Sequence, residues 1–394
     1  MNKKLLPLTL GGLGIGITEF VMMGLLPDIA TDLKVSIPQA GYLISAYALG
    51  VVIGAPLLVG IAGKYPPKKI LIALMVLFTA FNAFSAFAPT FDTLFIARLL
   101  SGLPHGAFFG VGSVVASRLA EKGKEAQAVS LMFAGLTLAN IVGVPLGTFI
   151  GHNFSWRFSF AIVVLVGLIT LFSLKALLPS LPANENRDLK KELGFFKKQD
   201  AWIIILMISI GTGGLFTWYS YIAPLMTNVA GFSAESVTYV LMLAGLGMMA
   251  GNFFGGYLAD RFSPAKASAT LLIAMVITLI IVHFVSFQPI LALVMTFLTG
   301  AVSFALAAPI QMLMIRTAKG SEMIAAAVSQ ASFNIGNALG AFFGGLPISF
   351  GYDYTSPALV GAAMAFLGAG FALWLIVKNL AIKNQEASPQ TNLV

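Results

Sequence analysis

Residues 5–30 read LLPLTLGGLGIGITEFVMMGLLPDIA, an apolar run with Glu19 near its middle. About 20 helical residues, each rising about 1.5 Å, cross the ~30 Å hydrocarbon core of a bilayer, so this run predicts a membrane-spanning helix. A carboxylate at that depth rarely faces lipid, because its charge is costly there. We therefore expect Glu19 to meet a wet cavity, a basic partner or a proton, and we interpret the other spans as its housing.

The composition is that of a membrane protein. Hydrophobic residues make up 58% of the 394 residues and charged residues only 10%, whereas soluble domains carry about 25% charged residues. The chain has no cysteine, which excludes a disulfide framework, a thiol nucleophile and a thiolate metal site. The net charge of +8 does not indicate a nucleic-acid partner, since the basic residues lie in short loops. The sequence offers no metal-ligand cluster, phosphate-binding loop or nucleophile–base pair, so we expect no enzyme activity, metal or cofactor.

Twelve runs of spanning length predict an all-α membrane protein with two pseudo-symmetric bundles of six helices. A polar segment at 181–200 is interpreted as a cytoplasmic linker between an N-terminal half (1–180) and a C-terminal half (201–394) with a short cytoplasmic tail. The first run is too long for a removable signal peptide and lacks a small-residue cleavage site, so we expect a true span. The runs lie at 5–29, 39–62, 69–88, 92–117, 126–151, 157–178, 201–227, 234–259, 267–286, 289–315, 322–350 and 355–377.

The basic residues predict the orientation. With both termini in the cytoplasm, all but three of the 23 basic residues fall on the cytoplasmic side, as positively charged loops prefer. Lys34 and Arg157 lie outside, and Arg98 lies within a span. This orientation requires an even number of spans. We expect a multi-pass protein of the bacterial cytoplasmic (inner) membrane.

The two halves repeat. The pattern Gly50-x-x-x-Gly54 of span two recurs in span eight as Gly247-x-x-x-Gly251, 197 residues later. Six spans separate equivalent positions, so the halves share one topology, a plan that recurs in transporters with the substrate site between the halves near the midplane. Further matches at this spacing, or one residue more, pair Pro27 with Pro224, Tyr42 with Tyr239, Lys64 with Arg261, Pro67 with Pro264, Lys69 with Lys266, Gly102 with Gly300 and Arg118 with Arg316.

The loop after span eight, residues 256–264, reads GYLADRFSP. It resembles the loop signature of the major facilitator superfamily, in which an aspartate and its basic neighbours latch the cytoplasmic ends of adjacent helices. The resemblance implies conformational roles for Asp260 and Arg261, and for Lys64 in the N-terminal copy. That copy carries Gly63 where the aspartate is usual, so we expect a weaker latch there; alternatively, its lysines simply hold the loop inside.

Span four carries Arg98 at the depth of Glu19. Arg98 lies about 9 Å inward of Asp92, and Glu19 about 13 Å inward of Asp28. A guanidinium keeps its proton and must find an acceptor in lipid, so we expect Arg98 to pair with Glu19 if spans one and four are neighbours. Burial disfavours a charged carboxyl and Arg98 favours it, so breaking the pair would permit protonation. The alternative partner is the set of backbone carbonyls.

Residues 98–106, RLLSGLPHG, also resemble the span-four pattern that the superfamily links to proton transfer. His105 lies on the same helix face as Arg98, about 10 Å further inward. It is a candidate proton relay or substrate ligand, although a lone histidine in a span is as often a hydrogen-bonded packing residue. Glu19, Arg98 and His105 form the predicted proton-coupling set.

Span five contains GLTLANIVGVPLG at 135–147. It resembles the fifth-span signature of the superfamily's antiporter branch, a turn rich in glycine and proline, and this resemblance favours export over uptake. Proline within a span frees a backbone carbonyl, and glycines on one face allow a close sliding contact. We therefore expect conformational roles for Gly143, Pro145 and Gly147.

The C-terminal half has uncharged polar and aromatic residues in its spans and no deep carboxylate. Such groups suit a neutral, sugar-like or amphipathic ligand. Alternatively, they hydrogen-bond one another between helices. The candidate substrate-binding residues are Trp218, Tyr221, Gln311, Gln330, Asn334 and Asn337, together with Asn140 of span five.

Over nearly its whole length the chain resembles the twelve-span drug:proton antiporters and sugar-efflux transporters of this superfamily, including FSWR at 154–157 and ASFNIG at 331–336. The resemblance implies a monomeric transporter that exports a small molecule, a sugar or a drug-like compound, against inward proton flow. Multidrug resistance is one expected consequence. A proton-coupled importer or facilitator on the same fold is the alternative, and a membrane enzyme or receptor a distant one.

Overall fold

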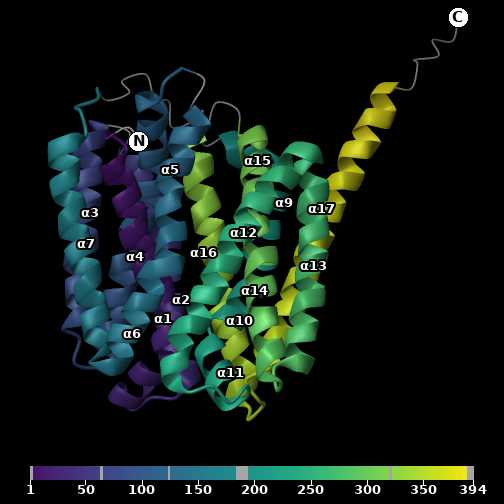
Figure 1. The fold of residues 1–394 in the computed structure, drawn as a ribbon. Coiled ribbons are helices and arrows are strands. Elements are labelled where there is room, and N and C mark those ends of the chain that lie inside the picture. The colour runs from purple at the N-terminus through teal and green to yellow at the C-terminus, as the bar shows by residue number, and fades with distance from the viewer. Residues whose placement is uncertain (1–2, 63–64, 123–124, 183–193, 319–321, 388–394) are drawn as a thin grey trace, which may run out of the picture.

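The computed structural model describes residues 3–62, 65–122, 125–182, 194–318 and 322–387. Within these ranges the regular structure is entirely helical (Figure 1). The N-terminal half contains α1 (Leu6–Leu33), α2 (Ile37–Ala62), α3 (Pro67–Ala86), α4 (Phe91–Leu119), α5 (Glu125–Leu138), η1 (Ala139–Gly143), α6 (Val144–Asn153) and α7 (Trp156–Leu177). The predicted linker contains η2 (Gly194–Lys197). The C-terminal half follows with α9 (Gln199–Gly211), α10 (Gly213–Tyr219), α11 (Ile222–Asn228), η3 (Ala234–Ser236), α12 (Val237–Arg261), α13 (Pro264–Val285), α14 (Pro289–Ala305), α15 (Ala307–Thr317), α16 (Glu322–Ser349) and α17 (Ser356–Ala387).

The predicted twelve spans are confirmed as helices, alone or as consecutive segments. Span five is α5–η1–α6, span seven is α9–α10–α11, and span ten is α14–α15. Eleven spans in the described part are long and apolar enough to cross a membrane. The remaining predicted span, span eleven (α16), is long enough but carries polar residues at 330, 334 and 337, and it packs on α2, α10, α9 and α4. Protein rather than lipid therefore surrounds much of it.

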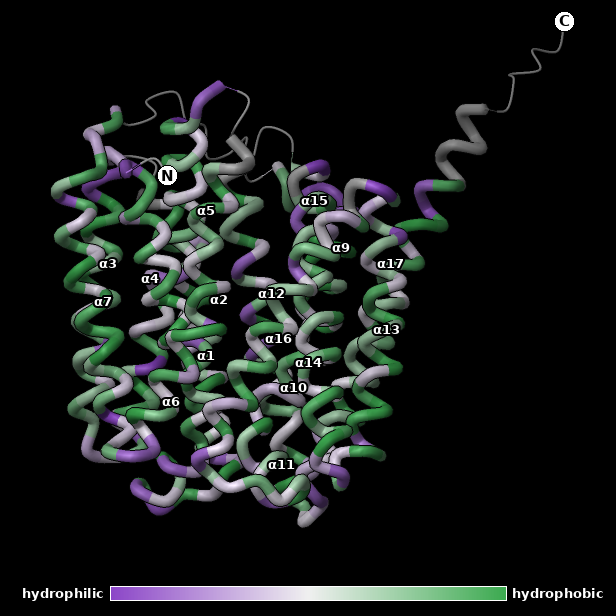
Figure 2. Tube along the Cα trace, viewed as in Figure 1, coloured by the Kyte–Doolittle hydropathy of each residue, from purple (hydrophilic) through white to green (hydrophobic). Residues whose placement is uncertain are grey.

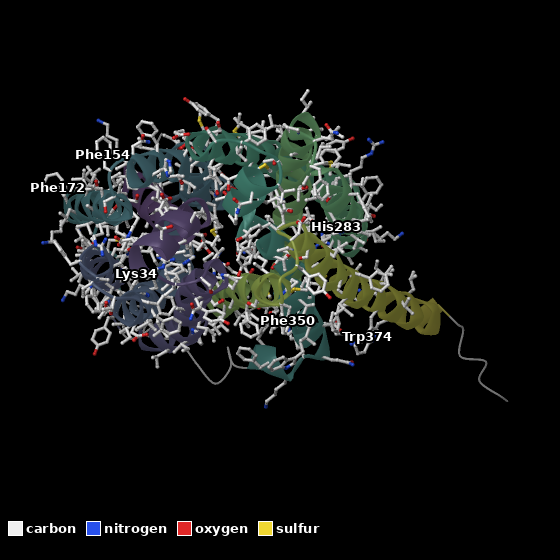
Figure 3. The ribbon with its side chains drawn as sticks, turned by 90° about the horizontal axis from the view of Figure 1, so that it is seen from below. Lys34, Phe154, Phe172, His283, Phe350 and Trp374 are labelled. Carbon is white, nitrogen blue, oxygen red and sulfur yellow. The ribbon has the colours of Figure 1, made fainter. Side chains whose placement is uncertain are left out.

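The helices form two bundles side by side, purple to blue and green to yellow in Figure 1, and the beginning of α1 lies at the same end as the end of α17. By the distribution of basic residues this is the cytoplasmic end. Figure 2 shows polar segments gathered at the two ends and an apolar band between them. Large apolar side chains point away from the bundle in that band, such as Phe172, which is 74% exposed (Figure 3), as expected of a lipid-facing surface. The half boundaries at 180 and 201 stay a prediction, and 183–193 of the linker lie outside the described residues.

The sequence repeat corresponds to a repeat in packing. A side chain at Gly50 would collide with the Leu99 carbonyl oxygen, and one at Gly247 with the equivalent Phe297 oxygen. The same holds for Gly54 against Leu103 and for Gly251 against Ala301. In each half these two glycines of one span therefore let its backbone lie against the span that follows two places later.

The halves meet through α2 and α16, through α12 against η1 and α6, and through α1 and α11. Several spans at this interface are interrupted. The chain forms one π-helical turn at η1, directly before Pro145, which has no N–H to donate. Span seven breaks twice, around Thr212 and around Tyr221. Broken spans at a repeat interface are typical of transporter binding sites.

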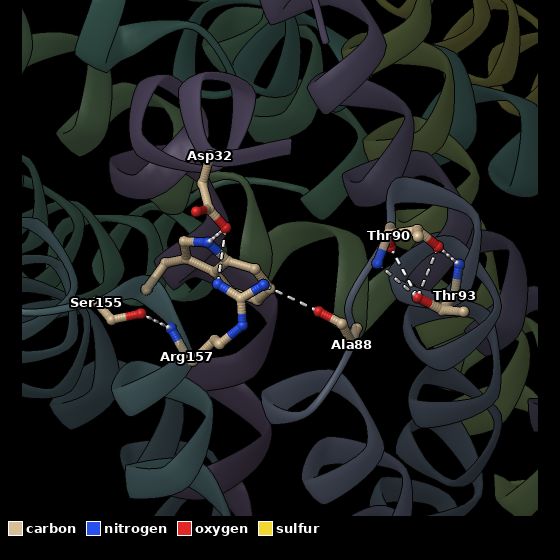
Figure 4. Close-up of polar contacts among 7 residues, drawn as sticks. Asp32, Ala88, Thr90, Thr93, Ser155 and Arg157 are labelled. Atoms are coloured by element: carbon tan, nitrogen blue, oxygen red, sulfur yellow. Dashed lines mark hydrogen bonds and ion pairs between the residues drawn. The ribbon is translucent and has the colours of Figure 1, made fainter. Parts of the chain in front are cut away.

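Polar contacts join the outer ends of the N-terminal spans (Figure 4). Arg157 Nη1 donates to Asp32 Oδ2 at 2.7 Å, and its Nη2 donates to the Ala88 carbonyl oxygen at 3.1 Å. Trp156 Nε1 donates to the same Asp32 oxygen at 2.9 Å. The start of α7 is thereby tied to the end of α1 and to the loop before α4.

Candidate functional site

Glu19 and Arg98 are both buried, with 2% and 0% of their surface exposed, on the packed helices α1 and α4. Arg98 Nη1 donates to Thr18 Oγ1 at 3.0 Å, and its guanidinium lies over the Tyr47 ring, 4.3 Å from the centroid. The Phe160 ring is a second aromatic neighbour at 5.7 Å. The cation is therefore held by a neutral hydroxyl and by ring faces, which attract cations electrostatically.

The predicted ion pair between Arg98 and Glu19 is not formed in this structure. The two side chains are electrostatic neighbours, but Thr18 takes the hydrogen bond that we expected Glu19 to accept. Within the described part of the chain, Glu19 Oε1 and Arg98 Nε and Nη2 have no hydrogen-bond partner. The reason is local geometry: Thr18 precedes Glu19 on α1, and its hydroxyl accepts the hydrogen bond from the guanidinium.

His105 is connected to this cluster through Tyr47. Its Nδ1 lies 3.1 Å from Tyr47 Oη, and both side chains are buried. Gln330 of the C-terminal half is its polar neighbour across the interface. Sequence reasoning missed Tyr47, which contacts both Arg98 and His105. The available signal was the deeper of the two tyrosines of span two, three residues before Gly50, which contacts span four.

The polar residues of α16 approach the N-terminal cluster from the other half. Asn334 and Asn337 are fully buried. Asn337 neighbours Glu19, and neither polar atom of its amide has a partner among the described residues. Asn334 Nδ2 donates to the Gln330 carbonyl oxygen at 3.1 Å, which leaves its Oδ1 unpaired in the same part of the chain. Asn337 beside Glu19 and Gln330 beside His105 thus bring polar groups of the two halves together between two apolar bundles.

The other substrate-binding candidates lie in different settings. Trp218 is buried, and its Nε1 lacks a partner among the described residues. Gln311 accepts from Ser329 Oγ at 3.2 Å. Tyr221 Oη donates to the Ala341 carbonyl oxygen at 2.6 Å, so its hydroxyl is engaged in packing. Asn140 donates to the Leu136 carbonyl of its own helix, and its backbone lies against Gly245 of α12.

The structure describes some of the residues with predicted conformational roles and not others. Gly143 and Gly147 lie against Ile17 and Val21 of α1, so the glycines of span five do form a close contact face. Pro145 follows η1 at the start of α6. Arg261 is exposed and donates to the Tyr257 hydroxyl. Lys64 and the side chain of Asp260 lie outside the described residues.

A cavity of about 150 Å³ lies between the halves near their outer end. His152, to which the sequence analysis assigned no role, lines it and lies with Nδ1 2.9 Å from Asp28 Oδ1. Its Nε2 is 4.0 Å from Glu235 of the other half. The remaining lining residues are Gly24, Pro27, Thr148, Ala223, Thr227, Ala234 and Val237.

Comparison with known proteins agrees with this architecture. The model of the Major Facilitator Superfamily matches residues 8–328. The chain is 43% identical to "Inner membrane transport protein YdhP" of Escherichia coli (strain K12) over 376 residues, which cover 95% of each protein. It is 38% identical to "Putative transporter AraJ" of the same organism over 366 residues, which cover 93% of each. The resemblance to this superfamily that the sequence indicated is thus confirmed.

Solved structures support the fold. The "Crystal structure of D-xylose-proton symporter" matches with a TM-score of 0.77 at 16% identity, covering 94% of this chain and 96% of that one. At this identity the match shows the fold alone. The family and the relatives are transporters, so the expectation that the chain is not an enzyme is confirmed. The names of the relatives and the eleven spans agree with a multi-pass protein of the inner membrane.

Proposed function

Because the chain belongs to the Major Facilitator Superfamily, we propose that this secondary transporter is a proton-coupled antiporter that exports a small neutral molecule by alternating access. Glu19 binds the proton, Arg98 competes for the carboxylate, and His105 takes part through Tyr47. The substrate, a sugar or an amphipathic drug-like compound, lies between this cluster and the amides of α16. The transporter acts as a monomer.

The observation that carries the proposal is the state of Glu19. It is a buried carboxyl beside a buried guanidinium, yet the guanidinium is bonded to Thr18 and Glu19 Oε1 is unpaired among the described residues. Burying an ionised oxygen that accepts no hydrogen bond is costly, so the unpaired Oε1 suits a protonated carboxyl. Protonation removes a charge from the interface between the halves. A proton can therefore shift the balance between two access states by its different affinity for each.

The neutral substrate class follows from the facing surface. Asn334, Asn337 and Trp218 offer uncharged hydrogen-bonding groups and an aromatic wall. A charged ligand would find no counter-charge on that side, because in the described spans of the C-terminal half the buried polar side chains are amides and hydroxyls. Amides and aromatic faces are the groups that orient neutral ligands in largely apolar pockets.

The test uses the whole protein in proteoliposomes. We expect Glu19→Gln to abolish accumulation driven by a pH gradient while substrate counterflow, which needs no net proton movement, persists. Asp92→Asn, an exposed acidic residue at the outer start of α4, is the matched control and should behave as the wild type. Full gradient-driven transport by Glu19→Gln contradicts the mechanism, and accumulation in right-side-out vesicles under an inward proton gradient indicates an importer.

A further inference from the structure

A buried chain of hydrogen bonds runs from span three to Arg98. Asn82 Nδ2 donates to the Phe78 carbonyl oxygen at 2.8 Å, and Thr18 Oγ1 donates to Asn82 Oδ1 at 2.6 Å. Arg98 Nη1 then donates to Thr18 Oγ1 at 3.0 Å. Thr18, Asn82 and Arg98 are each 0% exposed. Three helices, α1, α3 and α4, therefore contribute to the position of one guanidinium.

The donors and acceptors available fix the direction of each hydrogen bond in this series. The Phe78 carbonyl can only accept, so the amide of Asn82 must turn its NH₂ toward it and its oxygen toward Thr18. An amide oxygen can only accept, so the single hydroxyl proton of Thr18 is used on Asn82. The lone pairs of Thr18 then face Arg98. Asn82 thus makes the hydroxyl an obligate acceptor for the guanidinium.

Two acceptors compete for Arg98. Thr18 and Glu19 are adjacent in the chain, so their side chains leave α1 about 100° apart. One is a neutral hydroxyl, already bonded, and the other is a carboxyl whose Oε1 is unpaired within the described residues. The arginine side chain is long, its Nε and Nη2 are also unpaired there, and Glu19 is its electrostatic neighbour, so both acceptors are available to one guanidinium.

The internal repeat supports a joint role for these residues. At the equivalent positions of the C-terminal half, Leu215 replaces Thr18, Phe216 replaces Glu19, Leu279 replaces Asn82 and Thr296 replaces Arg98. The glycine contacts around them are kept in both halves. Where the guanidinium and the carboxyl are absent, the hydroxyl and the amide are absent as well, so neither is needed for the packing of the bundle.

We propose that Thr18, oriented by Asn82, is a positioning residue that holds the Arg98 guanidinium away from Glu19, so that the Glu19 carboxyl can carry a proton. The proposal rests on the proposed function, in which Glu19 is the proton site. When Arg98 leaves Thr18 for Glu19, its charge favours the carboxylate, and the proton leaves for the solvent that reaches the site. Thr18 exchanges no proton itself; it sets how tightly the carrier holds one.

The ionisable groups that face Glu19 are few. Arg98 comes from α4 and Tyr47 from α2, and both are its electrostatic neighbours. His105 follows one step away through its bond to Tyr47. From the other half, Tyr219 packs edge-on against the adjacent Phe20, with ring centroids 6.2 Å apart, and Asn337 is uncharged. A change in the pH profile of transport can therefore be traced to the Arg98 position by comparing variants of Thr18.

The test measures transport driven by a fixed substrate gradient as a function of pH in proteoliposomes, together with proton release on substrate binding. Thr18→Val removes the acceptor at nearly constant volume, so Arg98 moves to Glu19, and the midpoint should shift to lower pH by about one unit, a tenfold loss of proton affinity. Thr18→Ser keeps the hydroxyl and should restore the wild-type midpoint. Asn82→Asp anchors Arg98 on the Thr18 side, and the midpoint should move to higher pH.

The outcomes separate this proposal from the one on which it rests. If Glu19→Gln removes the pH dependence but Thr18→Val leaves the wild-type midpoint, the role of Thr18 is overturned and that of Glu19 stands. If the pH dependence survives in Glu19→Gln, both are overturned. Should Thr18→Val not fold, Asn82→Asp decides: an unchanged midpoint, or a shift to lower pH, contradicts the proposal.

Discussion

The two halves share one helix arrangement but differ in the chemistry at its centre. In the N-terminal half the buried polar set includes Glu19, Arg98 and His105, with Tyr47 between the last two. At the equivalent positions the C-terminal half has Phe216, Thr296, Ser303 and Ala244. The two halves therefore share the close approach of their backbones, whereas the ionisable groups of one half are replaced by neutral groups in the other. In the proposed transporter, one half binds the proton and the other presents hydrogen-bonding groups to the substrate.

The largest difference between the two halves is expected for substitutions at Arg98 and at its counterpart Thr296. We expect Arg98→Gln to reduce gradient-driven transport by about 100-fold or more, because about 3 kcal/mol of differential stabilisation of the Glu19 carboxylate is lost. Its counterpart Thr296→Val should leave coupling unchanged, since among the described residues the Thr296 hydroxyl donates only to the Ala292 carbonyl oxygen of its own helix. The measurement is accumulation at a fixed pH gradient. Equal losses in the two variants would show that coupling is not confined to one half.

The shared packing can be tested with matched glycine variants. Gly50→Val and Gly247→Val each place a side chain against a carbonyl oxygen of the neighbouring span. Overpacking of this kind costs about 1–3 kcal/mol, so both variants should lower the thermal unfolding midpoint of the purified protein by similar amounts. Strong destabilisation by only one of them would mean that the repeat in sequence is not a repeat in structural role.

The amides of α16 test whether the C-terminal half acts on substrate binding and not on proton coupling. Asn337→Ala should weaken substrate binding about fivefold, the equivalent of one hydrogen bond of about 1 kcal/mol, while proton coupling is kept. Ser332→Ala on the same helix is the control, because in the described part of the chain Ser332 Oγ donates only to the Val328 carbonyl oxygen of its own helix. Titration calorimetry or counterflow affinities provide the readout. An effect on coupling without an effect on affinity would assign Asn337 to the proton site.

The smallest effect is expected at the outer contact between the halves. Glu235 is 66% exposed and lies 4.0 Å from His152, so Glu235→Gln removes only a screened contact and should change the transport rate by no more than about twofold. His152→Gln also breaks the shorter contact with Asp28 at 2.9 Å and should have the larger effect of the two. The reverse order would indicate that the contact across the halves governs closure.

Much of the fold and part of the site could be predicted because their signals are local in the chain. Apolar runs long enough to cross a bilayer gave the spans, and glycines at one spacing gave the repeat, later seen in the contacts of Gly50 and Gly247. The eleventh span was recognised by length although its amides lower its hydropathy. Glu19 and Arg98 were found because charge within a span is costly and rare.

The predictions that failed or fell short concern partners. The sequence indicated equal depth for Arg98 and Glu19 but not the rotation of α1, which presents Thr18 to the guanidinium. Tyr221 stays a candidate substrate ligand, and the sequence did not indicate that its hydroxyl donates to the Ala341 carbonyl oxygen. Tyr47 and Asn82 were missed because a single tyrosine or asparagine in a span does not indicate which neighbour it faces.

The order of the residues is enough to establish that this chain crosses the membrane repeatedly, in two related halves, with one carboxyl and one guanidinium at mid-depth. Those properties depend on hydrophobicity and spacing along single helices. Which acceptor holds Arg98 is visible only in the folded protein, because it depends on how three helices are rotated and how closely they pack. Thr18 and Glu19 are adjacent in the chain, so the rotation of α1 decides whether a neutral hydroxyl or an ionisable acid bonds the guanidinium. In an interior with little water this choice has a large electrostatic effect.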